Sequence, residues 1–180
     1  MAGHLARRMI AVVLLLSAPV AFADEVPQKL ALTVMLKVLT YDQEFARHGT
    51  GDFVVFVVGE PEAVAPVLEA ADQIEQKTIS GRKLVFVQVS ASDVTAKLAR
   101  ASALLAPLGT GNAVARELAK VAAASKLYSL TLDPKLVEQG ITLGVGLAGN
   151  KPQPLINVTA ARACGVDFKP SVLKIAHTVQ

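Results

Sequence analysis

An uninterrupted run of six β-branched or aromatic residues, Phe53–Val58, constrains the fold more than any other feature of this chain. The run lacks the apolar-polar alternation of a strand with one solvated face, so it predicts a strand that is covered on both faces. Such strands are typical of parallel sheets, because the crossover helices of a parallel sheet cover both of its faces. Gly59-Glu60-Pro61 ends the run, and residues 62–76 then carry apolar side chains at the spacing of a helix.

The alternation of strands and helices continues along the chain. Further strands are predicted at residues 83–89, 102–106 and 127–132, and helices at 26–40, 92–98, 113–124 and 135–139. Asp93 is expected to cap the short helix 92–98, and Asp133 the short helix 135–139. Six residues separate the apolar segments 141–147 and 154–158, too few for a crossover helix, so these segments are expected to pair as a hairpin. Helical segments at 159–164 and 172–176, broken by Gly165, end the chain.

These elements predict an α/β fold. Its sheet is expected to be mostly parallel and doubly wound, with helices on both faces and a C-terminal antiparallel hairpin at one edge.

The first 23 residues have the layout of a signal peptide. Arg7 and Arg8 precede an apolar run at 9–16, and Ala21-Phe22-Ala23 offers a cleavage site for a signal peptidase. A membrane anchor would need about 18 uninterrupted apolar residues, whereas Ser17 and Pro19 interrupt this run. We therefore expect export by the general secretory route, cleavage after Ala23, and a single α/β domain at residues 24–180.

Composition excludes several classes of function. Removing residues 1–23 lowers the formal net charge from +3 to +1, and the chain has no Trp and only 4% aromatic residues, so neither nucleic acid nor an anionic membrane is expected as a partner. One Cys and three His make an internal disulfide and a Cys/His zinc site untenable, and no metal site is predicted.

Two glycine-rich segments are candidates for ligand binding. Gly144, Gly146 and Gly149 match the G-x-G-x-x-G pattern, but they lie in a predicted strand and its turn rather than at the start of a helix, so a structural role is expected. Gly109-Thr110-Gly111-Asn112 is better placed, because it follows a predicted strand and opens a helix, where free N–H groups can bind an anionic ligand. This segment has no Walker lysine, no cofactor is predicted, and a purely structural loop is the alternative.

No set of residues has the pattern of a catalytic site. Cys164 lies among apolar neighbours and is expected to pack in the core, while His48 and His177 stand far apart and the chain lacks the G-x-S-x-G elbow of hydrolases. The neighbouring carboxylates are expected to be solvated surface groups; they are Asp42, Glu44, Glu60 and Glu62. No catalytic residue is therefore assigned, and an enzyme is not expected.

Several segments, in their order, resemble the YfiR family of bacterial periplasmic proteins. They are Thr78–Val85, Leu127–Gly140, Ile141–Leu147, Leu155–Val158, the helix start Thr159–Arg162 and the final segment Val172–Ala176. The resemblance covers roughly residues 30–178. Two features depart from the family: Tyr41-Asp42 replaces the Trp-Pro that typically follows the first helix, and the paired cysteines of well-known members are reduced to Cys164.

The resemblance implies a periplasmic regulator without catalytic activity. Members of this family bind the extracytoplasmic domain of a membrane signalling protein, a diguanylate cyclase, and repress it, which lowers cyclic-di-GMP signalling and biofilm formation. A homodimer and a small ligand are left open as further partners, and redox control is not implied for a chain with one cysteine. The alternative is a small periplasmic solute-binding protein, although two lobes with a cleft between them would require a longer chain.

Overall fold

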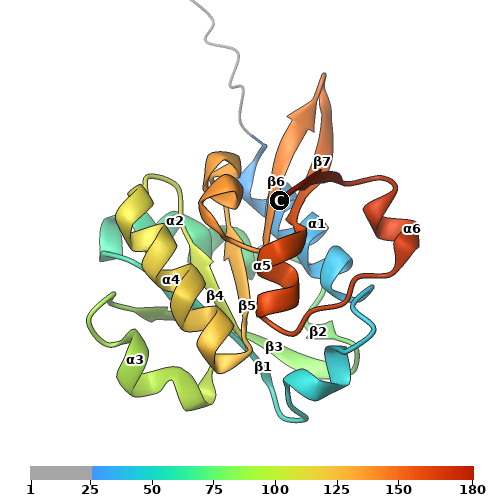
Figure 1. The fold of residues 1–180 in the computed structure, drawn as a ribbon. Coiled ribbons are helices and arrows are strands. Elements are labelled where there is room, and N and C mark those ends of the chain that lie inside the picture. The colour runs from blue at the N-terminus through green and yellow to red at the C-terminus, as the bar shows by residue number, and fades with distance from the viewer. Residues whose placement is uncertain (1–25) are drawn as a thin grey trace, which may run out of the picture.

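The computed structural model describes residues 26–180, so the expected signal peptide and its cleavage site lie outside the described residues. One eight-stranded sheet runs through this part of the chain in the order β2-β3-β1-β4-β5-β6-β7-β8 (Figure 1). Its five mutually parallel strands are β1 (Phe53–Val58), β3 (Arg82–Val89), β4 (Ala103–Ala106), β5 (Tyr128–Thr131) and β6 (Leu143–Ala148). The outer strands are β2 (Thr78–Ile79), β7 (Lys151–Asn157) and β8 (His177–Val179).

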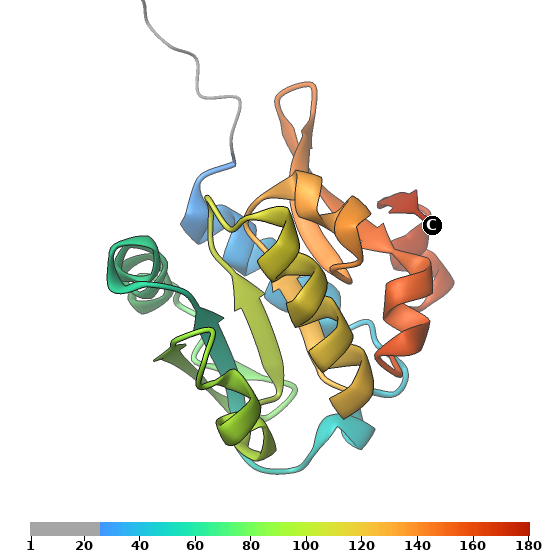
Figure 2. The same ribbon diagram turned by 60° about the vertical axis from the view of Figure 1, so that its left-hand side comes forward.

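Helices cover both faces of the sheet. The helices are α1 (Gln28–Leu39), α2 (Pro61–Asp72), α3 (Val94–Lys97), α4 (Asn112–Ser125), α5 (Val158–Ala163) and α6 (Pro170–Leu173), with the 3-10 turns η1 (Phe45–His48), η2 (Leu98–Arg100) and η3 (Pro134–Gln139). α1 packs on α2 and on the β6–β7 hairpin, whereas α4 packs on β4, β5, η3 and α5 on the opposite face (Figure 2). The expected α/β class with a mostly parallel, doubly wound sheet is therefore confirmed.

The central strand β1 is buried as its sequence predicts. Phe53, Val55 and Val57 are fully buried, and Phe56 and Val58 are nearly so. Because successive side chains of a strand point to opposite faces, both faces of β1 must be covered. Its parallel neighbours β3 and β4 hold it at the middle of the α/β layers.

The C-terminal hairpin is also confirmed, with a turn shorter than expected. β6 and β7 pair antiparallel from Leu143–Ile156 to Ala148–Lys151, which leaves only Gly149 and Asn150 in the turn.

The last predicted helix, 172–176, begins and ends too late, because α6 spans Pro170–Leu173. α6 ends at Leu173, and the chain then extends into β8, which pairs parallel with β7 and forms the outermost strand. Only Val172 of this segment is buried, so the apolar pattern at 172–176 has little core to face, and the backbone of β7 offers hydrogen bonds to β8 instead.

Local capping agrees with the sequence at one short helix and differs at the other. The Asp133 carboxylate accepts a hydrogen bond from the backbone N–H of Lys135 at 3.0 Å and caps η3, which is a 3-10 turn rather than an α-helix. Asp93 does not cap α3, because its carboxylate accepts a hydrogen bond from the Lys97 ammonium at 2.9 Å instead of from a backbone N–H.

Candidate functional site

The predicted ligand loop, Gly109 to Asn112, lies at the carboxyl end of β4 and leads into α4. Gly109 has a positive φ of 80°, and the Thr110 hydroxyl donates a hydrogen bond to the Pro107 carbonyl at 2.8 Å, which closes the turn. Gly111 is the N-cap of α4 and supplies no side-chain cap. The first N–H groups of α4 therefore remain available to an anionic or carbonyl group of a ligand.

This loop stands where the order of strands reverses direction. The chain passes from β1 to β3 on one side and then returns to β4 on the other side of β1. In open α/β sheets, ligands bind beyond the carboxyl ends of the strands at such a point. The gap between the segments that follow β1 and β4 is narrow here, since a Cβ added at Gly59 would meet the Pro107 ring at 3.4 Å. Binding by the loop stays a prediction.

A buried polar cluster occupies the opposite, amino end of the strands. Asp42, in the turn after α1, has a fully buried carboxylate that accepts a hydrogen bond from the Tyr128 hydroxyl at 2.7 Å. Its other oxygen accepts hydrogen bonds from the backbone N–H groups of Glu44, at 3.0 Å, and Asp167, at 2.8 Å. The sequence-based interpretation of Asp42 as a solvated carboxylate is wrong, because three donors compensate its burial, and two of them, Tyr128 and Asp167, are distant in the sequence.

His48 completes this cluster. Its ring lies 4.3 Å from that of Tyr128, and its Nδ1 is 2.8 Å from the Lys126 carbonyl at the end of α4. Its Nε2 lies 3.4 Å from Asp42 Oδ2, and the His48 side chain is only 3% exposed. The cluster thus ties the turn after α1 to β5 and to the end of α4.

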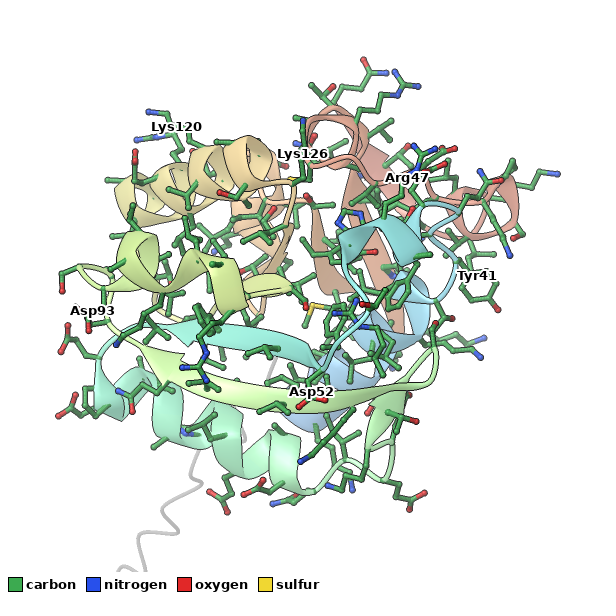
Figure 3. All side chains as sticks on the ribbon, turned by 90° about the horizontal axis from the view of Figure 1, so that it is seen from below. Tyr41, Arg47, Asp52, Asp93, Lys120 and Lys126 are labelled. Carbon is green, nitrogen blue, oxygen red and sulfur yellow. The ribbon has the colours of Figure 1, made fainter. Side chains whose placement is uncertain are left out.

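Arg82 holds the neighbouring loop from the start of β3. Its guanidinium donates hydrogen bonds to the carbonyls of Gly51, Asp52 and His48 and to the Ser102 hydroxyl. It also lies over the ring of Phe53, 5.2 Å from the centroid. Figure 3 places Asp52 and Arg47 at this end of the molecule. Arg82 therefore acts in the fold as a clamp on the segment between η1 and β1.

The electrostatics of the cluster favour stability over catalysis. Burial opposes the charged form of Asp42, but the nearby His48 ring and the hydrogen bonds from Tyr128 and two backbone N–H groups outweigh it and lower the pKa of Asp42. Burial and the Asp42 carboxylate raise the pKa of Tyr128, which remains a hydroxyl donor. The side chains of Asp42, His48 and Tyr128 thus contact one another and are shielded from solvent.

The remaining sequence candidates also have structural roles. A Cβ at Gly144 would lie 2.8 Å from Val137 Cγ2, and Gly149 adopts φ 61° in the hairpin turn, so the glycine pattern serves the strand and its turn. Cys164 is buried, and burial raises the pKa of its thiol. Glu60 and Glu62 are exposed, as expected.

A cavity of about 460 Å³ lies between α4, η3 and α5. Alanine side chains of α4 and α5 form much of its lining, with Arg116 and Lys120 beside them. Arg116 donates a hydrogen bond to the Gln139 side chain at 2.9 Å, and Figure 3 shows Lys120 on the exposed side of α4. Sequence reasoning did not find this cavity, because alanine at helical spacing signals only helix formation.

Within residues 26–180, no group of three or more His, Cys, Asp or Glu side chains is arranged to hold a metal ion. No described helix combines the length and the apolar character needed to cross a membrane.

The model of the YfiR/HmsC-like family, DUF4154, matches residues 28–177. The chain belongs to this family. The match contains every described strand except the last two residues of β8, and it also contains the Asp42 cluster and the Gly109 loop. The predicted family resemblance is confirmed. No curated protein matches the sequence.

Solved structures with a similar fold belong to more distant proteins. A conserved domain protein from Vibrio cholerae has a TM-score of 0.58 at 16% identity, and this YfiR/HmsC-like chain covers 60% of it. An ABC domain from Streptococcus pneumoniae in complex with L-Trp has a TM-score of 0.57 at 14% sequence identity, and the chain covers 62% of it. The ligand-free, open substrate-binding protein CD0873 from Clostridium difficile has a TM-score of 0.59 at 12% sequence identity, and the chain covers 61% of it. Between 86% and 87% of the present chain is aligned in each case. The chain thus spans about three fifths of these proteins, and at such identities they share its fold.

Proposed function

We propose that this protein is a non-enzymatic periplasmic regulator that binds the extracytoplasmic domain of a membrane signalling protein, a diguanylate cyclase, and represses it. The family match over residues 28–177 is the observation that carries this proposal. The mature chain in this proposal is a single α/β domain that starts at Asp24, after removal of the signal peptide in the periplasm.

The state of the ionisable side chains supports a role in binding. The buried groups Asp42, His48 and Tyr128 are engaged with one another, and Cys164 is buried with a raised thiol pKa. A fold whose reactive groups are enclosed in this way acts through its surface. Binding regulates a partner only when it favours one of the partner's states, and a shift from 1:99 to 99:1 requires a preference of about 5.5 kcal/mol.

The test combines a deletion strain with purified proteins. Deleting the gene should raise cyclic-di-GMP, and expression of the full chain should restore repression. A version that lacks residues 1–23 and stays in the cytoplasm should fail to restore it. Purified residues 24–180 should form a complex with the partner's periplasmic domain. Unchanged cyclic-di-GMP in the deletion strain, together with the absence of a complex, would overturn the proposal.

Binding of a small ligand is a second candidate function. The fold similarity to proteins described as substrate-binding or as bound to L-Trp supports it, together with the free N–H groups that the Gly109 loop presents at the switch point of the sheet. Thermal unfolding of residues 24–180 tests this candidate function. The unfolding should be measured without ligand, with L-Trp at about 1 mM, and with other amino acids as probes, because a bound ligand raises the unfolding midpoint by mass action.

The matched variants for this test are Gly111→Leu and Gly51→Leu. A Cβ at either position meets no atom within 4 Å, so both variants should fold. If the Gly109 loop holds the ligand, only Gly111→Leu should lose the shift. Equal shifts in both variants would exclude this loop.

A further inference from the structure

The cavity between α4, η3 and α5 has the size of a site for a small molecule. Its volume is about 460 Å³. Ligand sites in proteins have volumes of roughly 300–1,000 Å³ and are mostly apolar, with a few polar groups that orient the ligand. α4 and α5 lie beside each other and form two of its walls (Figure 2). The residues of the lining therefore decide which class of ligand fits.

The cavity forms because the side chains between the two helices are short. Ala119 and Ala123 line it from α4, and Ala160 and Ala163 line it from α5. Each of these side chains ends at Cβ, so none of them reaches across the space that longer side chains fill in a close-packed interior. The surface that they form is uncharged and apolar. It favours an apolar group of the ligand.

Two hydrogen bonds fix the walls of the cavity relative to one another. Near the C-terminal end of α4, the Lys126 ammonium donates a hydrogen bond to the Ala163 carbonyl at 2.7 Å and ties α4 to α5. Closer to the start of α4, the Arg116 guanidinium donates one to the Gln139 side chain at 2.9 Å and ties α4 to η3. From Arg116 to Ala123 the lining extends about 10 Å along α4. The cavity is therefore elongated along this helix.

Cationic side chains of α4 border the cavity. Arg116 and Lys120 line it one helical turn apart, and Glu138 carries the one carboxylate side chain among the described lining residues. Lys120 lies 3.7 Å from Glu117, whereas Arg116 takes part in none of the ion pairs found in the described part of the chain. A guanidinium has several N–H donors, and Gln139 is a neutral acceptor for one of them. Arg116 is thus held in place with donors left for an anionic group.

We propose that this cavity binds the carboxylate form of a medium-chain fatty acid. The unbranched acyl chain lies along the alanine side chains of α4 and α5, and the carboxylate accepts hydrogen bonds from Arg116, with Lys120 one turn further along α4. An extended chain of the length of octanoate matches the elongated lining. This proposal is independent of the regulator proposal and concerns a site other than the Gly109 loop.

Octanoate is the probe for the test, and octanol is its matched neutral control, because the two molecules have chains of the same length. Each is titrated into isotope-labelled residues 24–180 while the amide chemical shifts are followed by NMR. Octanoate should cause saturable shifts at the alanines that line the cavity. Octanol lacks the anionic group, so it should bind at the same place about tenfold more weakly.

Ala123→Leu and Ala124→Leu test whether the probe occupies this cavity. The two positions are adjacent on α4, but Ala123 lines the cavity, whereas Ala124 is exposed and lies outside the lining. Ala123→Leu fills the cavity and should abolish the saturable shifts for both probes, and Ala124→Leu should leave them unchanged. If Ala123→Leu does not fold, Ala163→Leu takes its place, because Ala163 lines the cavity from α5 and is itself exposed.

Arg116→Gln tests the contact with the carboxylate. It should weaken the binding of octanoate about tenfold and leave that of octanol unchanged. Arg100→Gln, at an exposed arginine of η2, should change neither affinity. Three outcomes would overturn the proposal: no saturable shift in the wild type, shifts that persist in both cavity-filling variants, or equal affinities for octanoate and octanol.

Discussion

The two ends of the parallel strands use their polar groups in opposite ways. At the amino ends, the Tyr128 hydroxyl donates to the buried Asp42 carboxylate, and the half-buried Arg82 guanidinium donates to backbone carbonyls of the neighbouring loop. At the carboxyl ends, the Gly109 loop presents backbone N–H groups and no charged side chain. The difference shows that the chemistry-bearing side chains of this protein maintain the fold, while exposed backbone groups remain available for binding.

Replacing Asp42 with Ala should have the largest effect on stability. The substitution leaves the Tyr128 hydroxyl and the N–H groups of Glu44 and Asp167 without their acceptor. We expect a loss of about 3–5 kcal/mol in the free energy of unfolding, measured by urea denaturation. Glu60→Ala, at an exposed carboxylate, should change it by less than about 0.5 kcal/mol. Similar values for the two variants would contradict the structural role of the cluster.

Gly144→Ala should have the next largest effect. Its Cβ would lie 2.8 Å from Val137 Cγ2 and 3.2 Å from Thr131 Cγ2, so β6 and η3 must move apart. We expect a loss of about 1–3 kcal/mol, measured in the same way. Gly51→Ala is the control, because its Cβ would meet nothing within 4 Å. A stable Gly144→Ala protein would mean that this glycine is retained for a reason other than packing.

Cys164→Ala should cost about 1 kcal/mol, because it leaves a small cavity in the core. The native thiol should react slowly with a thiol reagent at neutral pH, since burial raises its pKa. Fast modification of the native protein with loss of repression would instead identify Cys164 as a reactive site.

Acid should reveal the contribution of the Asp42 charge, which we expect to be the smallest of these effects. The folded state lowers the pKa of Asp42 below its ordinary value of 3.8, so this contribution is present above that value and is lost as pH falls through the lower, folded-state pKa. In urea denaturation from pH 6 to pH 2, Asp42→Asn should therefore lose less stability than the wild type. If the stability of the wild type and of Asp42→Asn fell equally with pH, the pKa of Asp42 would be the same in the folded and unfolded states.

Much of the layered fold follows from local sequence. Phe53–Val58 predicts a doubly covered strand because every residue in it is apolar, and the six residues between two apolar segments predict a hairpin because no helix fits between them. The β2 strand and the β8 strand could not be predicted in this way. Each is three residues or fewer and is stabilised by hydrogen bonds to a neighbouring strand rather than by its own apolar pattern.

The candidate sites also differ in whether sequence or tertiary structure determined them. The sequence alone determined that Gly109-Thr110-Gly111-Asn112 joins a strand to a helix and that Cys164 lies among apolar residues. It also determined that the segments in the second half of the chain follow one another in the order found in the family. Only the tertiary structure decided that Asp42 is buried, because its donors come from Tyr128 and Asp167, 86 and 125 positions away. The same holds for the cavity between α4, η3 and α5, because its lining comes from three segments that are separate in the sequence.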